Sequence, residues 1–204
     1  MSILQDYEKI SKDMGFKYEA ISDYLKSKVS DKNYKSYEKE LKNIDYENPY
    51  FNEKIEDLKK RYNIILLDDV LYNKDEYNKF DKWFNNYLKP FKITRLDDVY
   101  SVCLFDYNYY YDWLDEEKTK TAKYGDGHCY EDAFSDYLND YKKYFDDFLE
   151  YDSERSMFCV YCQNKKDAES VAYILSKLYK DKRKMLDLIR VTKKNYDYEF
   201  DFSI

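Results

Sequence analysis

Tyrosine is the residue that most constrains how this chain can fold. The 204 residues include 27 tyrosines and 12 phenylalanines, whereas Leu, Ile, Val and Phe together make up only about 23% of the chain. That fraction lies just above the roughly 20% below which highly charged chains tend to stay disordered. We therefore expect tyrosine rings to supply much of the core, with their hydroxyl groups reaching water or a hydrogen-bond partner. The codon bias of an AT-rich genome is an alternative source of the same excess.

Charge is distributed unevenly along the chain, whose formal net charge is -7. Residues 97–154 hold 17 Asp and Glu against 5 Lys and Arg, while residues 1–96 carry a balance of +1 and residues 155–204 of +4. Because salt confines the influence of an exposed charge to roughly 10 Å, local charge decides partners more than net charge does. The acidic, tyrosine-rich middle therefore predicts a cationic partner.

Hydrophobic spacing predicts helices in the N-terminal half and a mixture of helices and strands in the C-terminal half. The expected helices are residues 3–14, 16–25, 31–41, 52–62 and 74–88, with Gly15 as a C-cap and Asp31 as an N-cap. Ile64–Leu67 is apolar enough for either a buried strand or a helix end. The predicted boundary between two regions lies at 92, giving a helical region 1–92 and an α+β region 93–204.

The C-terminal half is expected to hold a small, mostly antiparallel sheet packed by two helices, so the predicted fold class is α+β. Strands are predicted from Val99 to Tyr107 and from Met157 to Cys162, and two closing strands at 186–192 and 196–202. The two helices are predicted at residues 130–151 and 165–180. The expected buried stripe of the first helix is Phe134, Tyr137, Leu138, Tyr141, Tyr144, Phe145 and Phe148.

Acidic residues dominate the first of these two helices. Residues 131–154 carry nine Asp and Glu against two Lys, which is about one negative charge per 4 Å of helix axis, close to the roughly 3.4 Å spacing along one DNA strand. Such a surface predicts competition for a nucleic-acid groove, although most charge runs are ordinary solvated faces. The predicted partner-binding residues combine these acids with nearby acids and aromatic anchors: Asp112, Asp115, Glu116, Glu117, Asp132, Asp136, Asp140, Asp146, Asp147, Glu150, Tyr109, Tyr110, Tyr111 and Trp113.

The segment 125–129 is the most enzyme-like part of the sequence. It places the only histidine, His128, beside Cys129 between glycines, and a thiolate needs a nearby base to act as a nucleophile. Cys159 and Cys162 could join His128 and Cys129 as zinc ligands, although residues three apart on a strand point to opposite faces. A glycine-rich surface loop and two buried cysteines are the simpler interpretations, so no catalytic residue, metal or cofactor is predicted.

The C-terminal segment is rich in basic residues, which suit phosphate binding or pairing with the acidic middle in the fold or in a homodimer. These residues are Lys177, Lys180, Lys182, Arg183, Lys184, Arg190, Lys193 and Lys194. We favour the pairing. The sequence contains no 18-residue apolar window and no apolar leader at its start, so a cytoplasmic protein without disulfides is expected.

Two blocks of sequence resemble small uncharacterised accessory proteins of mobile elements and phages from low-GC Gram-positive bacteria. The first block is Leu4–Ile10 with Tyr18–Ile21 and Tyr24–Leu25, and the second is Leu67–Tyr72 with Tyr77–Trp83. The resemblance implies an accessory role of the anti-CRISPR or anti-restriction type and carries over no functional residue.

These observations favour a non-enzymatic inhibitor that blocks a basic groove of a nucleic-acid-handling protein, such as a CRISPR effector nuclease or a restriction enzyme. Neither a membrane nor direct nucleic-acid binding is expected. The alternatives are an enzyme that uses His128 and Cys129, and a regulatory protein that binds nucleic acid through the basic C-terminal segment.

Overall fold

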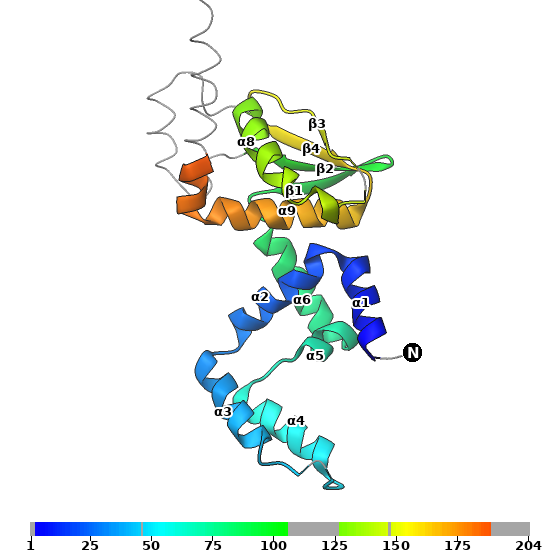
Figure 1. The fold of residues 1–204 in the computed structure, drawn as a ribbon, viewed down its shortest axis with the longest axis vertical. Helices are drawn as coiled ribbons and strands as arrows, with labels where there is room; N and C mark the ends of the chain where they lie inside the picture. The colour runs from blue at the N-terminus through cyan, green and yellow to red at the C-terminus, as the bar shows by residue number, and fades with distance from the viewer. Residues whose placement is uncertain (1–2, 46, 106–126, 147, 189–204) are drawn as a thin grey trace, which may run out of the picture. The chain divides into compact units, whose positions relative to one another are not determined.

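The computed structural model describes residues 3–45, 47–105, 127–146 and 148–188 (Figure 1). The chain forms two compact units, which we name the helical unit (residues 18–86) and the α+β unit (residues 1–17 with 87–204). The elements in chain order are α1 (Ile3–Met14), α2 (Phe16–Lys28), α3 (Asp31–Leu41), α4 (Phe51–Tyr62), α5 (Leu67–Tyr72), α6 (Lys74–Tyr87), β1 (Lys92–Leu96), β2 (Val99–Leu104), α8 (Gly127–Asn139), η1 (Lys142–Tyr144), β3 (Glu150–Tyr151), β4 (Phe158–Cys162) and α9 (Lys165–Lys180).

The α+β unit is built on a four-stranded antiparallel sheet with the strand order β1-β2-β4-β3. Leu96 pairs with Val99 across a two-residue connection, in which Asp97 adopts a left-handed conformation with φ 48°. Aspartate tolerates this region better than most residues, which suits a tight turn. The α+β fold class, with a helical N-terminal half and a mostly antiparallel sheet in the C-terminal half, is confirmed.

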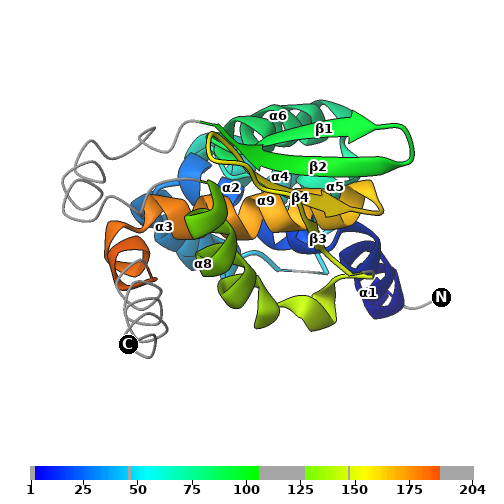
Figure 2. The same cartoon turned by 90° about the horizontal axis from the view of Figure 1, so that it is seen from above.

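Aromatic rings join helices α8 and α9 of this unit to the sheet. The ring centroid of Phe91 lies 5.9 Å from that of Phe134 on α8, 5.9 Å from that of Tyr179 on α9 and 6.5 Å from that of Phe158 on β4. Figure 2 shows α9 running along the sheet, with α8 beside it. The core is therefore built on phenylalanine and tyrosine, as the composition predicts.

Helix α9 is the central element of the α+β unit. Twelve of its 16 residues are buried, so it is nearly surrounded by protein, unlike a surface helix with one apolar stripe. The helix begins at a well-formed cap, where the Asn164 side chain accepts a hydrogen bond from the Asp167 amide at 2.8 Å. The predicted boundaries, 165 to 180, are confirmed.

Two small apolar clusters hold the helical unit together. In the first, the Tyr24 ring packs edge-on against Phe80 at 5.5 Å and lies 5.5 Å from Trp83. In the second, Tyr37 of α3, Leu58 of α4 and Ile64 form a buried group. The predicted helices of this region are present, and Gly15, with φ +56°, follows α1 as expected.

Several local expectations are wrong. The N-cap of α3 is Ser30, whose hydroxyl accepts from the Asn33 amide at 3.2 Å, so Asp31 is the first helical residue instead of the cap. Residues 64–66 are neither strand nor helix, and α5 begins directly after them. Residues 186–188, predicted to begin a strand, are helical and belong to a helix that begins at residue 182. The rest of that strand and the predicted strand 196–202 lie outside the described residues.

The strands β1 and β3 were missed by the sequence analysis. Four of the five residues of β1 are exposed and only Ile93 is partly buried, so no apolar alternation marks the strand. Its turn, Asp97-Asp98, also lacks the glycine that usually signals a two-residue hairpin. β3 is two residues long and falls within the predicted helix 130–151, which in fact ends at Asn139.

Candidate partner-binding surface

Helix α8 starts where the backbone passes unusually close to another segment. A Cβ atom on Gly127 would lie 1.9 Å from the Glu154 carbonyl oxygen and 2.0 Å from that of Met157, so only glycine fits. The Gly127 amide donates to the Arg155 carbonyl at 3.2 Å. This glycine therefore fixes the first turn of α8 against the turn that precedes β4.

The buried side of α8 orients its acidic side. Ala133, Phe134 and Leu138 are almost fully buried in the α+β core. Asp136 is exposed on α8, and Asp140 is exposed immediately after the helix. The acidic residues at this end of α8 thus face solvent because the apolar residues between them anchor the helix.

A groove of about 580 Å³ lies between α8 and the segment that follows it. This size is within the range of ordinary ligand and peptide-side-chain sites, which is about 300–1,000 Å³. We call it the α8 groove. It is lined by Ser135, Asp136, Leu138, Asn139, Lys142, Phe145, Asp146, Phe148, Leu149 and Tyr151.

Phe148 is the most exposed large apolar side chain among the described residues, at 93% of its full surface. Burying a phenylalanine is worth roughly 1.5–3 kcal/mol, so a ring left in water is available as a binding anchor. Its neighbour Phe145 is only 9% exposed. The segment is therefore attached to the core by one phenylalanine and presents the other to solvent.

The start of α9 fixes this segment in place. Asp146 forms an ion pair with Lys166 at 2.6 Å, and its amide donates to Asp167 Oδ2 at 2.8 Å. Asp167 is 1% exposed and also accepts a hydrogen bond from the Asn164 side-chain amide at 3.0 Å. The Asp167 carboxylate, which also holds the capping residue Asn164, thus positions the segment leading to Phe148.

The structure describes five of the predicted partner-binding residues, and only two of them lie on α8. Asp132 and Asp136 lie on α8, whereas Asp140, Asp146 and Glu150 follow it without continuing the helix. The other predicted residues lie outside the described part of the chain: Tyr109, Tyr110, Tyr111, Asp112, Trp113, Asp115, Glu116, Glu117 and Asp147.

The acidic helix is shorter than predicted for a local reason. Asn139 and Asp140 are weak helix formers, and the Tyr141 amide bonds to the Leu138 carbonyl at 2.9 Å, three residues back. Such a bond tightens the last turn and leads into the 3₁₀ helix η1. The turn removes Tyr144 and Phe148 from the predicted buried stripe, and both are exposed.

The exposure of Phe148 was not predicted, because a continuous helix over residues 130–151 would place this side chain on its buried face. The adjacent pair Asn139-Asp140 was the available signal. Two weak helix formers in succession indicate a possible helix end.

The segment around His128 is helical instead of forming the predicted loop. Gly127–Cys129 opens α8 and His128 is exposed. Gly125, Asp126 and the side chain of Cys129 lie outside the described residues. No group of three or more metal-ligating side chains occurs in the part of the chain that the structure describes.

Cys159 contacts a cysteine that the zinc interpretation did not include. Its sulfur lies 3.3 Å from that of Cys103, the residue directly opposite it on β2, and both side chains are buried. The hydrogen bond between them lowers the pKa of Cys103 to about 7 and raises that of Cys159. Burial raises the pKa of Cys162 to about 12. The contact between Cys103 and Cys159 is that of two buried residues packed side by side on neighbouring strands.

Two residues of the basic C-terminal segment make contacts with Tyr87 and Asp181. Lys180 donates to the Tyr87 carbonyl, and Lys184 lies 3.8 Å from Asp181. These contacts are inside the α+β unit, but neither involves the acidic residues 97–154. Arg190, Lys193 and Lys194 lie outside the described residues.

Comparison with known proteins identifies the α+β unit. Residues 91–194, just over half of the chain, match the family model of immunity protein 51. The chain belongs to the immunity protein 51 family. No significant match exists among curated proteins or among solved structures. None of the described helices is long and apolar enough to cross a membrane.

The immunity protein 51 match places the protein in an immunity family, which agrees with the expected accessory, inhibitor-type role and with a protein partner. The matched residues include β1 to β4, α8, α9 and the whole α8 groove. The helical unit lies outside the match.

Proposed function

We propose that this immunity-family protein inhibits a basic, nucleic-acid-handling protein by binding it through the α8 groove. Phe148 enters an apolar pocket of the partner, and Asp136 and Asp140 meet its Lys and Arg side chains. The single observation that carries the proposal is the 93% exposure of Phe148 beside acidic residues on an anchored segment.

The arrangement of the groove supports an interaction site. Interfaces derive most of their affinity from a few aromatic anchors, and rim charges mainly increase the association rate and specificity. The anchor and Asp136 belong to one surface, because both line the same groove, and Asp140 is exposed directly after α8. The contacts of Asp146 with Lys166 and Asp167 hold the segment before binding, which lowers the ordering cost of association.

A nucleic-acid-handling partner follows from the charge. Such proteins present basic grooves, and an acidic surface that occupies the groove excludes the nucleic acid. A nuclease toxin fits an immunity family, and CRISPR effectors and restriction enzymes are partners with the same surface chemistry.

The direct test measures binding of the purified full chain to a panel of nuclease toxins, CRISPR effector nucleases and restriction enzymes at about 100 mM and about 500 mM salt. We expect one of them to bind, more weakly at high salt, and to lose its nuclease activity. Phe148→Ala should then weaken binding about thirtyfold, as for a hot-spot aromatic. The matched control is Phe105→Ala, which removes another exposed phenylalanine outside the groove. Equal effects of the two substitutions would contradict a role for the groove.

Charge reversal separates electrostatic attraction from the aromatic anchor. Asp136→Lys with Asp140→Lys should slow association and reduce its salt dependence. Asp57→Lys with Glu38→Lys makes the same charge change at exposed positions of the helical unit and should have little effect. Asp146 is left unchanged because it also positions the segment. Unchanged association by the first double variant would refute the charge argument.

A further inference from the structure

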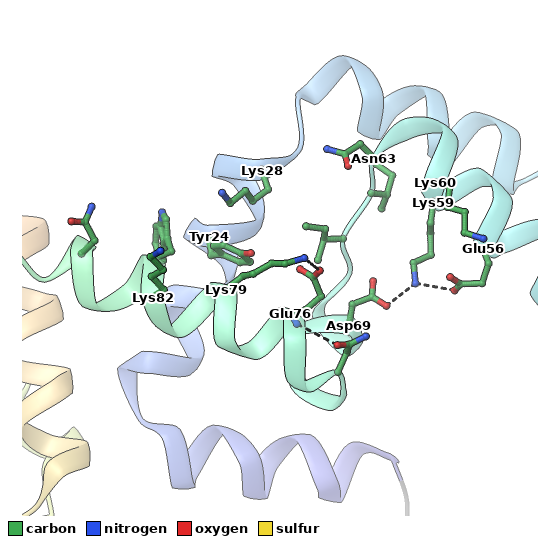
Figure 3. A pocket seen from close by; sticks show the side chains of 15 residues that line it. Tyr24, Lys28, Glu56, Lys59, Lys60, Asn63, Asp69, Glu76, Lys79 and Lys82 are labelled. Carbon is green, nitrogen blue, oxygen red and sulfur yellow. Dashed lines mark hydrogen bonds and ion pairs between the residues drawn. The ribbon is translucent and has the colours of Figure 1, made fainter.

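A second hollow lies entirely within the helical unit and has different chemistry. It has a volume of about 790 Å³ and is formed by α2, α4, α5, α6 and the residues that join them (Figure 3). It lies outside the residues that match the immunity family. Its volume is suited to a small ligand.

Lysine ammonium groups outnumber carboxylates around this hollow. Five lysines and three carboxylates line it. The carboxylates are already engaged, since Lys59 contacts Asp69 at 2.6 Å and Glu56 at 2.9 Å, and Lys79 contacts Glu76 at 2.6 Å. Figure 3 shows the Lys59 side chain between Asp69 and Glu56.

The other three lysines have no ion pair with any described residue. They are Lys28 from α2, Lys60 from α4 and Lys82 from α6. Because the carboxylates are already paired, these three lysines leave the lining of the hollow with an excess of positive charge. The hollow therefore favours a ligand with at least one phosphate-like group, which lysine binds as a point charge.

One carboxylate oxygen requires a hydrogen-bond donor. Glu76 Oε2 is buried and has no hydrogen-bond partner among the described residues, although Oε1 is paired with Lys79. A buried acceptor left without a donor is costly. A fully ionised anion such as sulfate offers no donor, so the ligand must combine negative charge with an N–H or O–H group.

Aromatic rings line the same hollow. Tyr24 is buried and Trp83 is partly exposed, with their centroids 5.5 Å apart. The ammonium of Lys28 lies 5.5 Å from the centre of the Tyr24 ring. A planar heterocycle can pack against the exposed part of Trp83 while its charged end reaches the lysines.

We propose that the helical unit binds a nucleoside phosphate in this hollow. The phosphate is held by the unpaired lysines, the base packs against Trp83, and a ribose hydroxyl or base N–H donates to Glu76 Oε2. Nucleoside phosphates carry all three features in one small molecule. The site is separate from the α8 groove and does not depend on the function proposed for it.

The test titrates the full chain with ATP, GTP, CTP and UTP, with inorganic triphosphate, and with adenosine, following tryptophan fluorescence. The chain has two tryptophans, so the measurements use a Trp113→Phe background in which Trp83 alone reports. We expect saturable binding of at least one nucleotide with Kd below about 1 mM. Triphosphate alone and adenosine alone should each bind at least about tenfold more weakly.

Variants test the assigned roles. Lys28→Gln with Lys60→Gln should weaken nucleotide binding at least about tenfold, while the control Lys35→Gln with Lys54→Gln, two exposed lysines outside the hollow, should not. Glu76→Gln should weaken it about tenfold by losing the charged acceptor. Circular dichroism melting checks that each variant folds. Absence of nucleotide binding, or equal binding of triphosphate and nucleotide, would overturn the proposal.

Discussion

The two units differ in how many residues their helices bury. In the α+β unit, helix α9 has 12 of its 16 residues buried. The helices α3 to α6 of the helical unit each bury only one or two residues. Since apolar burial is the main stabilising contribution, the α+β unit should resist unfolding more strongly. The family match falls on this unit, whereas the helical unit lies outside it and has its own surface chemistry.

Core truncation should separate the units most clearly. Leu175→Ala empties a fully buried position in α9 and should cost about 4 kcal/mol of unfolding free energy, whereas Leu58→Ala in α4 should cost about 2 kcal/mol because its smaller cluster relaxes more easily. Urea unfolding followed by Trp83 fluorescence and by circular dichroism checks both values. Equal costs would mean that the helical unit is packed as tightly as the α+β unit.

Removal of one ion-pair partner should give the next largest difference. In the α+β unit Lys17 and Glu169 lie 3.2 Å apart with side chains 6% and 11% exposed, while Arg61 and Glu40 of the helical unit are 59% and 41% exposed. Lys17→Met should cost about 3 kcal/mol because it leaves the mostly buried Glu169 carboxylate with only the exposed Lys165, 3.4 Å away, as its ion-pair partner. Arg61→Met should cost less than about 1 kcal/mol. Adding Glu169→Gln to Lys17→Met should recover part of the loss in urea unfolding, and no recovery would refute the stranded-charge explanation.

Removal of a helix cap should also cost more unfolding free energy in the α+β unit than in the helical unit, by a smaller margin. Asn164→Ala should cost about 1.5 kcal/mol, and Ser30→Ala about 0.5 kcal/mol, because Asn164 also bonds to the buried Asp167 while Ser30 is exposed. Thermal melts would detect both changes. If Ser30→Ala proved the more damaging substitution, local capping would matter more than the surroundings of the cap.

Alkaline pH should have the smallest effect and opposite signs in the two units. Burial lowers the pKa of Lys180 to about 8 from 10.5, so the unfolded chain binds more protons between these values and the free energy of unfolding rises with pH across that window. For Lys59 in the helical unit, burial lowers the pKa, but hydrogen bonds to Asp69 and Glu56 raise it further, so the net pKa is raised. Its stabilising contribution is present below pH 10.5 and lost above it.

Urea midpoints measured from about pH 7.5 to about pH 10 test the Lys180 effect, with Lys180→Gln as the variant that should abolish the rise. The Lys180 ammonium lies 3.3 Å from the centre of the Tyr87 ring, which favours the charged form. A flat profile in the unsubstituted protein would mean that this attraction outweighs the loss of hydration.

The sequence predicted long, periodic elements well and short or exposed ones poorly. The hydrophobic pattern of α9 and the apolar run of β4 were sufficient to predict these two elements, because most of their side chains are buried. β1 lies at an edge with four of five residues exposed, so its pairing with β2 supplies order that no local pattern encodes. The strand predicted at 186–192 is helical over 186–188, since the apolar residues there suit either period.

The candidate surface was predicted in part. The acidic character of residues 127–150 was visible in the sequence, but the end of α8 at Asn139 was not, and that end determines which rings are exposed. The segment that carries Phe148 is also held by contacts of Asp146 with Lys166 and Asp167, which lie 20 and 21 residues away in the chain. The hollow of the helical unit escaped prediction for the same reason, because its lysines come from three separate helices.

The contacts at the two ends of the helical unit have a consequence for how this protein can be modified. Lys17, just before that unit, pairs with Glu169, and Tyr87, just after it, has its ring 5.6 Å from that of Tyr173. Glu169 and Tyr173 are one turn apart on α9, roughly 6 Å along its axis. The chain thus leaves and rejoins the α+β unit at neighbouring points, and residues 18–86 form an insertion that a short linker could replace without breaking the sheet or α9.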